Sequence, residues 1–231
     1  MGYETIEITP MTPRIGAEVS GIDLTESLGN QQFQELHDAL MEHSVLFFRN
    51  QDVDVEQHKN FGRLFGDLHI HPGSPPPPGH PEILIVHADK NSKHIAGENW
   101  HSDVTCDAEP PMGSILHLWE VPESGGDTLF ASMEAAYDDL SERMKIYLDG
   151  LNATHSGEQI YRGRYNNQKH DDTNVTYPRN VHPVVRTHPV TGRKSIFVNK
   201  TFTTHINEIP KAESDSVCLL YTSPSPRDSS K

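Results

Sequence analysis

The stretch Asn99-Trp-His-Ser-Asp-Val-Thr105 decides how the rest of the chain is interpreted. It contains a His-x-Asp triplet, His101 and Asp103, in a segment where polar and apolar residues alternate as they do in a strand. Because residues i and i+2 of a strand point to the same face, one imidazole and one carboxylate can converge on a single ion. With a histidine from elsewhere, such a pair forms the facial triad of non-haem Fe(II) oxygenases.

The same triplet spacing occurs twice more, at His87–Asp89 and His170–Asp172. Chance alone predicts about one occurrence in a chain with this content of His and Asp. His87 ends an apolar run and leads into a turn, whereas His170 lies in a polar stretch with no strand pattern. Context therefore favours His101 and Asp103 as the candidate metal pair, although spacing alone leaves the other two triplets open.

Hydrophobic periodicity predicts alternating strands and helices before the motif and mostly short strands after it. Before the motif we expect strands over Glu4–Thr9, Val45–Phe48 and Ile83–Val86, and helices over Gln31–Ser44 and from an Asp54 cap to a stop at Gly66. After it we expect a helix over Met133–Leu148, capped by Ser132, and a hairpin turn at His188–Gly192. The strands expected there are Ser114–Val121, Thr128–Ala131, Val181–Thr187 and Ser195–Val198. This pattern indicates a sandwich or jelly roll with flanking helices.

Several strings resemble, in the same order, the taurine dioxygenase (TauD/TfdA-like) family of Fe(II)- and 2-oxoglutarate-dependent oxygenases. The resemblance covers Ile6 to about Val217 and is carried by residues 16–24, 65–72, 99–105, 125–129, 182–192, 197–199 and 202–204. It implies a mostly β fold with flanking helices, a double-stranded β-helix or jelly roll. It also implies that the chain comes from a dioxygenase that hydroxylates a small anionic substrate, such as a taurine-like sulfonate or an alkyl sulfate.

The resemblance implies roles for five residues. His101 and Asp103 match the Fe(II) ligands, and Thr128 matches the hydroxyl that donates a hydrogen bond to a carboxylate of the cosubstrate 2-oxoglutarate. His71 matches the residue that contacts the anionic group of the substrate, and Phe202 matches a second substrate contact. No side chain is assigned as a catalytic acid, base or nucleophile, because iron and O₂ carry out the oxidation.

The chain departs from the family at its C-terminal end. The family's second histidine ligand and its 2-oxoglutarate-binding arginine lie in a block that begins near Trp-Asp-Asn-Arg, and this sequence has tryptophan only at 100 and 119. His155, His182, His188 and His205 stand where the family has no ligand, so we assign none of them to the metal. The sequence therefore predicts a fragment that lacks the third ligand, binds iron weakly or not at all, and is inactive by itself.

The last residues differ in composition from the rest. Residues 211–217 look like the start of a helix that does not continue, and residues 218–231 (CLLYTSPSPRDSSK) are rich in Ser and Pro. We expect an oxygenase domain over 1–217, incomplete at its C-terminus, followed by a non-native tail over 218–231. A natural disordered terminus is the alternative interpretation.

The substrate region also differs from that of taurine-type members. Where those members place a Tyr and an Asn, this chain has Ser74 and Gly97, and its loop contains four consecutive prolines. Two other classes of function also stay open. One is a non-catalytic jelly-roll module that binds a small anion, which has no reason to keep two metal ligands. The other is a zinc hydrolase, which would need a His-rich site and a general base that the sequence does not show.

Composition narrows the partners of the protein. The 231 residues carry 19 Lys and Arg against 33 Asp and Glu, a net charge of −14, which disfavours nucleic acids and anionic membranes as partners. No apolar run approaches the roughly 20 residues that span a bilayer, no signal peptide is evident, and two cysteines make no disulfide framework. We expect a cytoplasmic protein whose partner is a small organic anion; a homo-oligomer is compatible with this composition.

Overall fold

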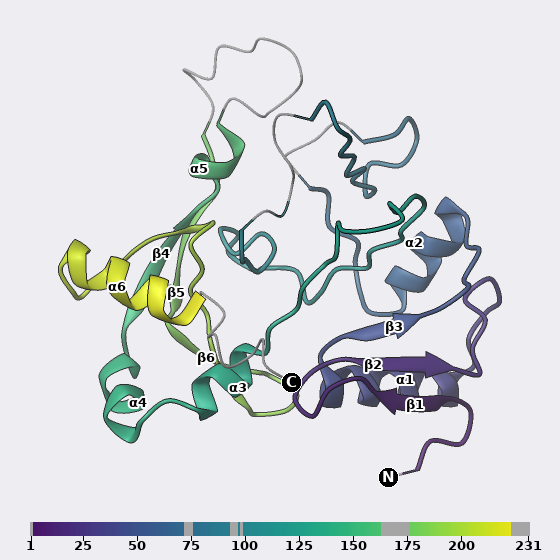
Figure 1. Ribbon diagram of the computed structural model, residues 1–231, viewed down its shortest axis with the longest axis horizontal. Coiled ribbons are helices and arrows are strands. Elements are labelled where there is room, and N and C mark those ends of the chain that lie inside the picture. The colour runs from purple at the N-terminus through teal and green to yellow at the C-terminus, as the bar shows by residue number, and fades with distance from the viewer. Residues whose placement is uncertain (1, 72–75, 93–96, 98, 163–175, 223–231) are drawn as a thin grey trace. The chain divides into compact units, whose positions relative to one another are not determined.

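The computed structural model describes residues 2–71, 76–92, 97, 99–162 and 176–222 (Figure 1). The chain divides into two compact units, one formed by residues 1–68, 115–135 and 188–192 and the other by the remaining residues. Three predictions involve residues outside the described ranges: the His170–Asp172 triplet, Ser74, and residues 223–231 of the expected tail. No helix in the described part of the chain is long and apolar enough to cross a membrane.

The first unit is built on a three-stranded sheet of order β1-β2-β3, with β1 (Glu7–Pro10), β2 (Ala17–Ser20) and β3 (Leu46–Phe48). β1 and β2 pair antiparallel, whereas β2 and β3 pair parallel. Helix α1 (Asn30–His43) packs on this sheet, with Leu36 completely buried in a core that also contains Ile6, Val19 and Phe61 (Figure 1). The helix and the two strands predicted in this region are confirmed to within three residues at each end.

Helix α2 (Val55–Arg63) begins at a capping box. The carboxylate of Asp54 accepts a hydrogen bond from the backbone N–H of Gln57 at 2.8 Å, and the side chain of Gln57 accepts one from the N–H of Asp54 at 2.8 Å. These bonds satisfy backbone donors that the first turn leaves free, which confirms the predicted cap. The helix ends at Arg63, three residues before Gly66, the predicted stop.

The second unit contains an antiparallel sheet of order β5-β4-β8. Its strands are β4 (Asn152–Ser156), β5 (Arg179–Pro183) and β8 (Thr203–Ile206). A separate hairpin joins β6 (Val185–Thr187) and β7 (Lys194–Ile196), and the N–H of Gly192 donates to the carbonyl of His188 in its turn at 2.9 Å. The hairpin prediction is confirmed, while the single strand expected over Val181–Thr187 is interrupted at Val184.

Helices after the motif also differ in detail from the prediction. The expected helix over 133–148 is two helices, α3 (Met133–Asp138) and α4 (Glu142–Leu148), because Ser141 accepts a hydrogen bond from the N–H of Met144 and starts a new helix. The predicted cap at Ser132 is confirmed by its bond from the N–H of Ala135. A short helix, α5 (Glu158–Tyr161), follows β4.

The final helix, α6, extends over Lys211–Thr222 (Figure 1) and contacts β8. The hydroxyl of Ser214, completely buried, accepts a hydrogen bond from the N–H of Ile206 at 2.8 Å and fixes the helix against the strand. The expectation that this helix stops at Val217 is wrong, because five further residues are helical. The domain boundary at Val217 stays a prediction.

Three predicted strands are absent from the part of the chain that the structure describes. Residues 83–86, 114–121 and 128–131 are irregular, and their apolar side chains are largely exposed; Trp119 is 71% and Leu129 70% accessible. A strand becomes stable when a neighbour supplies ladder hydrogen bonds, and no described strand pairs with these segments. The described residues thus form small sheets with helices beside them, and the jelly roll stays a prediction.

Candidate metal and substrate site

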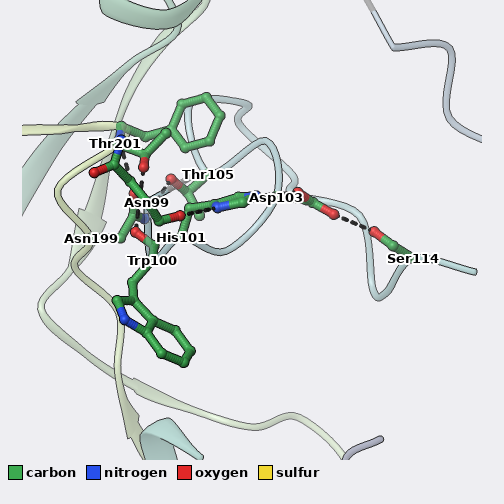
Figure 2. Close-up of polar contacts among 9 residues, drawn as sticks. Asn99, Trp100, His101, Asp103, Thr105, Ser114, Asn199 and Thr201 are labelled. Atoms are coloured by element: carbon green, nitrogen blue, oxygen red, sulfur yellow. Dashed lines mark hydrogen bonds and ion pairs between the residues drawn. The ribbon is translucent and has the colours of Figure 1, made fainter. Parts of the chain in front are cut away.

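His101 and Asp103, both in the second unit, lie side by side (Figure 2). The Nε2 atom of His101 is 3.2 Å from the Oδ1 atom of Asp103. Two ligands that each lie about 2.1 Å from a metal ion and meet there at a right angle are about 3 Å apart. The pair therefore has the separation that a shared ion requires, and its nitrogen and oxygen donors are two of the three in a facial triad.

The orientation of the His101 ring is fixed from its other side. Nδ1 lies 2.7 Å from the carbonyl oxygen of Asn99. Since a carbonyl only accepts, Nδ1 carries the proton of that bond, and the neutral ring keeps its lone pair on Nε2, toward Asp103. Two acceptors would then face each other unless a proton or a metal ion lies between them. In the metal-free chain the hydrogen bond to Asp103 raises the pKa of His101, despite the opposing effect of burial.

Ser114 holds the other oxygen of the carboxylate. Its hydroxyl donates to Oδ2 of Asp103 at 2.6 Å, which leaves Oδ1 turned toward His101 (Figure 2). Hydrogen bonds from His101, and to a smaller extent from Ser114, lower the pKa of Asp103 although burial opposes them. Partners of this kind orient metal ligands and tune their basicity. Sequence reasoning missed Ser114, because a contact across eleven residues of irregular chain leaves no local pattern.

The local conformation of the motif differs from the prediction. The segment is a turn, and Val104 adopts φ +49°. A β-branched residue with a positive φ is a strained exception, and it interrupts the alternation of faces along a strand. The expectation that His101 and Asp103 share one face of a strand is therefore wrong, although the two side chains do converge.

Among the described residues, no group of three or more His, Cys, Asp or Glu side chains is placed to hold one ion. The four histidines left unassigned from sequence include His155, which is completely buried. Burial and the nearby His182 and Arg186 lower the pKa of His155 to about 4, so its ring is neutral at pH 7. Its Nδ1 faces the hydroxyl of Thr105 at 2.9 Å, which makes it a packing and hydrogen-bonding partner of the motif.

The two residues assigned to the substrate are linked through a tyrosine ring. His71 is half-buried, and its ring centroid lies 5.7 Å from that of Tyr161, which in turn lies 6.2 Å from that of Phe202. Phe202 is only 4% exposed and belongs to a core cluster with Val104 and Tyr161. Burial, and next the neighbouring His69, lower the pKa of His71.

Thr128 is not in the unit that contains the metal pair. It lies in the first unit, exposed, within the irregular segment where a strand was expected. Its assignment to 2-oxoglutarate rests on the resemblance. Of the five predicted site residues, the structure brings His101 to Asp103 and joins His71 to Phe202 through Tyr161.

Comparison with known proteins identifies the family. A model of the family described as "Taurine catabolism dioxygenase TauD, TfdA family" matches residues 7–221. An alkylsulfatase from Acinetobacter baylyi is 39% identical over 208 residues, which cover 86% of this chain and 64% of the relative. An alpha-ketoglutarate-dependent sulfonate dioxygenase from Saccharomyces cerevisiae is 33% identical over 229 residues, which cover 94% of this chain and 55% of the relative.

A solved structure has a fold similar to that of this chain. The crystal structure of a taurine dioxygenase from Burkholderia xenovorans matches with a TM-score of 0.73 at 28% identity, over 94% of this chain and 72% of that one. The chain spans between about half and two thirds of the length of the first curated relatives that it matches. Because the family model extends over nearly the whole chain, the chain belongs to the TauD/TfdA family of taurine catabolism dioxygenases.

Proposed function

We propose that this chain is part of an Fe(II)- and 2-oxoglutarate-dependent dioxygenase that hydroxylates a small organic anion, a sulfonate or an alkyl sulfate. The observation that carries the proposal is the 3.2 Å approach of His101 Nε2 to Asp103 Oδ1, with each side chain held from behind by Asn99 or Ser114. These two donors suit a divalent ion such as Fe(II). The sequence relatives supply the reaction class.

The residues of this chain would bind and orient the reactants. His101 and Asp103 would hold the metal, and the hydroxyl of Thr128 would donate to a carboxylate of 2-oxoglutarate. Bound Fe(II) would supply the redox chemistry, in which O₂ converts 2-oxoglutarate to succinate and CO₂ and hydroxylates a C–H bond of the substrate. With only two ligands from the described residues, we expect the 231-residue chain alone to be inactive and to bind metal weakly.

The substrate class follows from two lines of support. Relatives are named as an alkylsulfatase and a sulfonate dioxygenase. In this chain, the half-buried His71 can donate one hydrogen bond to an anionic oxygen even when its ring is neutral. Its ring contacts the ring of Tyr161, which in turn contacts the ring of Phe202. Since the Tyr161 and Phe202 rings are 2% and 4% exposed, His71 is the part of this group that an anionic oxygen would contact.

The finer points of architecture and location belong to the same proposal. We expect the domain to be a double-stranded β-helix over residues 1–217, incomplete at its C-terminal end, in which further strands would pair with the exposed segments 114–121 and 128–131. We also expect a cytoplasmic protein. Neither Cys106 nor Cys218 forms a disulfide, as a reducing compartment favours.

The test measures turnover by the complete gene product, including any residues encoded after Lys231. O₂ uptake and succinate formation are measured with Fe(II) and 2-oxoglutarate, with taurine, hexanesulfonate or hexyl sulfate added. We expect succinate formation that one of these anions stimulates and that His101→Ala abolishes. Binding of the anion without any succinate would instead indicate the non-catalytic module, and hydrolysis without O₂ uptake would indicate a hydrolase.

A further inference from the structure

Asn199, in the loop between β7 and β8, contacts two functional segments through one buried amide. Its side chain is 5% exposed. Nδ2 donates to Oγ1 of Thr105 at 3.2 Å, and Oδ1 accepts from the backbone N–H of Phe202 at 2.8 Å. Thr105 lies two residues beyond Asp103, and Phe202 is the residue assigned to the substrate. Figure 2 shows the hydrogen-bonded group that contains Asn199 and Thr105 next to His101.

The direction of each hydrogen bond in this group follows from its donors. A backbone N–H can only donate, so Oδ1 of Asn199 faces Phe202 and Nδ2 faces Thr105. The Thr105 hydroxyl accepts that bond and also shares a hydrogen bond with Nδ1 of His155, 2.9 Å away. The neutral His155 ring can accept there. A flipped amide would place its NH₂ group against the backbone N–H of Phe202, two donors facing each other, so the bond from Phe202 fixes the orientation of the amide.

The backbone next to Thr105 needs such support. Val104 is 3% exposed and adopts φ +49°, a conformation that is strained for a β-branched residue and persists only where neighbours hold it. After Thr105, the carbonyl of Cys106 accepts from Nδ2 of Asn180 at 2.6 Å, and that of Asp107 lies 2.9 Å from Nε2 of His182. The strained turn directly behind Asp103 is thus anchored on its C-terminal side by side chains from the sheet region.

We propose that Asn199 is a positioning residue that, through Thr105, fixes the direction of the His101–Asp103 pair and, through the backbone of Phe202, fixes the ring beside the substrate. The proposal rests on the metal pair of the proposed function. Asn199 touches neither metal nor substrate in this role. Loss of the Thr105 hydroxyl would leave the buried Nδ2 group of Asn199 without this acceptor and release the turn at Val104.

The test uses the whole 231-residue chain and matched Thr→Val substitutions. Thr105→Val removes the hydroxyl while it keeps the shape, Thr105→Ser restores the hydroxyl, and Asn199→Ala removes the amide. Thr154→Val is the control, because Thr154 is also buried, at 5% exposed, and its hydroxyl donates to Asn207 at 2.7 Å and not to a residue of the motif. Two quantities are measured: Mn(II) affinity, from the EPR signal of free Mn(II), and amide hydrogen exchange of residues 100–106 without metal.

We expect Thr105→Val and Asn199→Ala each to lower Mn(II) affinity about tenfold and to speed exchange over residues 100–106 by a similar factor. Thr105→Ser should behave as the wild type, and Thr154→Val should lower stability only. The double variant Thr105→Val/Asn199→Ala should lose no more affinity than either single variant, because both substitutions remove the Asn199–Thr105 bond, which is the link from Asn199 to the metal pair. If Thr105→Val does not fold, the same measurements on Asn199→Ala test the proposal.

Equal effects of Thr105→Val and Thr154→Val, or additive losses in the double variant, would overturn the positioning role. His101→Ala separates this result from a failure of the proposed function. If His101→Ala leaves Mn(II) affinity unchanged, the metal pair is wrong, and the exchange rates of residues 100–106 still decide whether Asn199 orders the turn.

Discussion

The Nε2 atom of His101 lies 3.2 Å from the Oδ1 atom of Asp103, although the two residues are not on a strand. His101 lies in irregular chain, and Asp103 begins a turn over residues 103–106 in which Val104 adopts φ +49°. The approach depends on partners behind the two side chains, because nothing in a turn forces residues i and i+2 to converge. Those partners are the parts of the site that substitutions can test one at a time.

Ser114→Ala should weaken metal binding. The substitution removes the hydrogen bond to Oδ2 of Asp103, so the carboxylate is free to rotate and Oδ1 is no longer held toward His101. We expect the Mn(II) dissociation constant of the 231-residue chain to rise about tenfold. The measurement is an EPR titration at pH 7.

Ser141→Ala is the matched control for that experiment. Ser141 also uses its hydroxyl in one hydrogen bond, but as the cap of α4. Its loss should lower the free energy of unfolding by about 1 kcal/mol and leave Mn(II) affinity as it was. If both variants bound Mn(II) like the wild type, Ser114 would have no role in orienting Asp103.

His155 should make the protein less stable in mild acid. Its pKa is lowered to about 4 in the folded chain by burial, whereas a histidine in the unfolded chain titrates near 6.5. Between these values the unfolded state binds more protons, so stability present above about pH 6.5 is lost as the pH falls toward 4. The full difference corresponds to about 3 kcal/mol.

Urea unfolding of the wild type and His155→Gln at pH 7, 5.5 and 4.5 measures this contribution. We expect a flatter pH dependence for His155→Gln, and no such flattening for the exposed control His87→Gln. Parallel pH curves for the wild type and His155→Gln would show that folding does not change the pKa of His155, which would contradict the neutral buried ring.

Gly157→Ala should destabilise the second unit. A Cβ atom at Gly157 would lie 2.5 Å from Cε2 of Tyr161 and 3.2 Å from Sγ of Cys106, so the core around them must move. We expect a loss of about 1–3 kcal/mol in the free energy of unfolding. Gly113→Ala is the control, because nothing lies within 4 Å of a Cβ at that position. Equal stability of the two variants would be inconsistent with the packing at Tyr161.

The elements that sequence predicted well are those whose signals are local. Asp54 caps α2 because its carboxylate and the Gln57 side chain are three residues apart, and α1 follows from one apolar stripe. The strands expected over 114–121 and 128–131 depend on partners that the described residues do not supply, so their patterns do not form strands. Pairing is a property of two segments, and one segment's sequence does not reveal it.

The candidate site likewise has a part that the local sequence predicts and a part that depends on residues far apart in the chain. The His101–Asp103 pair could be predicted from the motif and the family resemblance, since the two residues are neighbours in sequence. The contacts that hold the pair come from Ser114 and, through Thr105, from Asn199, which is 94 residues beyond Thr105. No local pattern connects such positions, and the strained φ of Val104 has no signature in a valine.

The most direct test of the account is the metal affinity of the 231-residue chain with and without its two proposed ligands. Mn(II) titrations monitored by EPR would compare the wild type with His101→Ala and Asp103→Ala, and Thr154→Val would serve as a folded control. We predict weak binding of one Mn(II) by the wild type and by Thr154→Val, and a loss of at least about tenfold in each ligand variant. Unchanged affinity in both ligand variants would contradict the assignment of His101 and Asp103 as the metal pair.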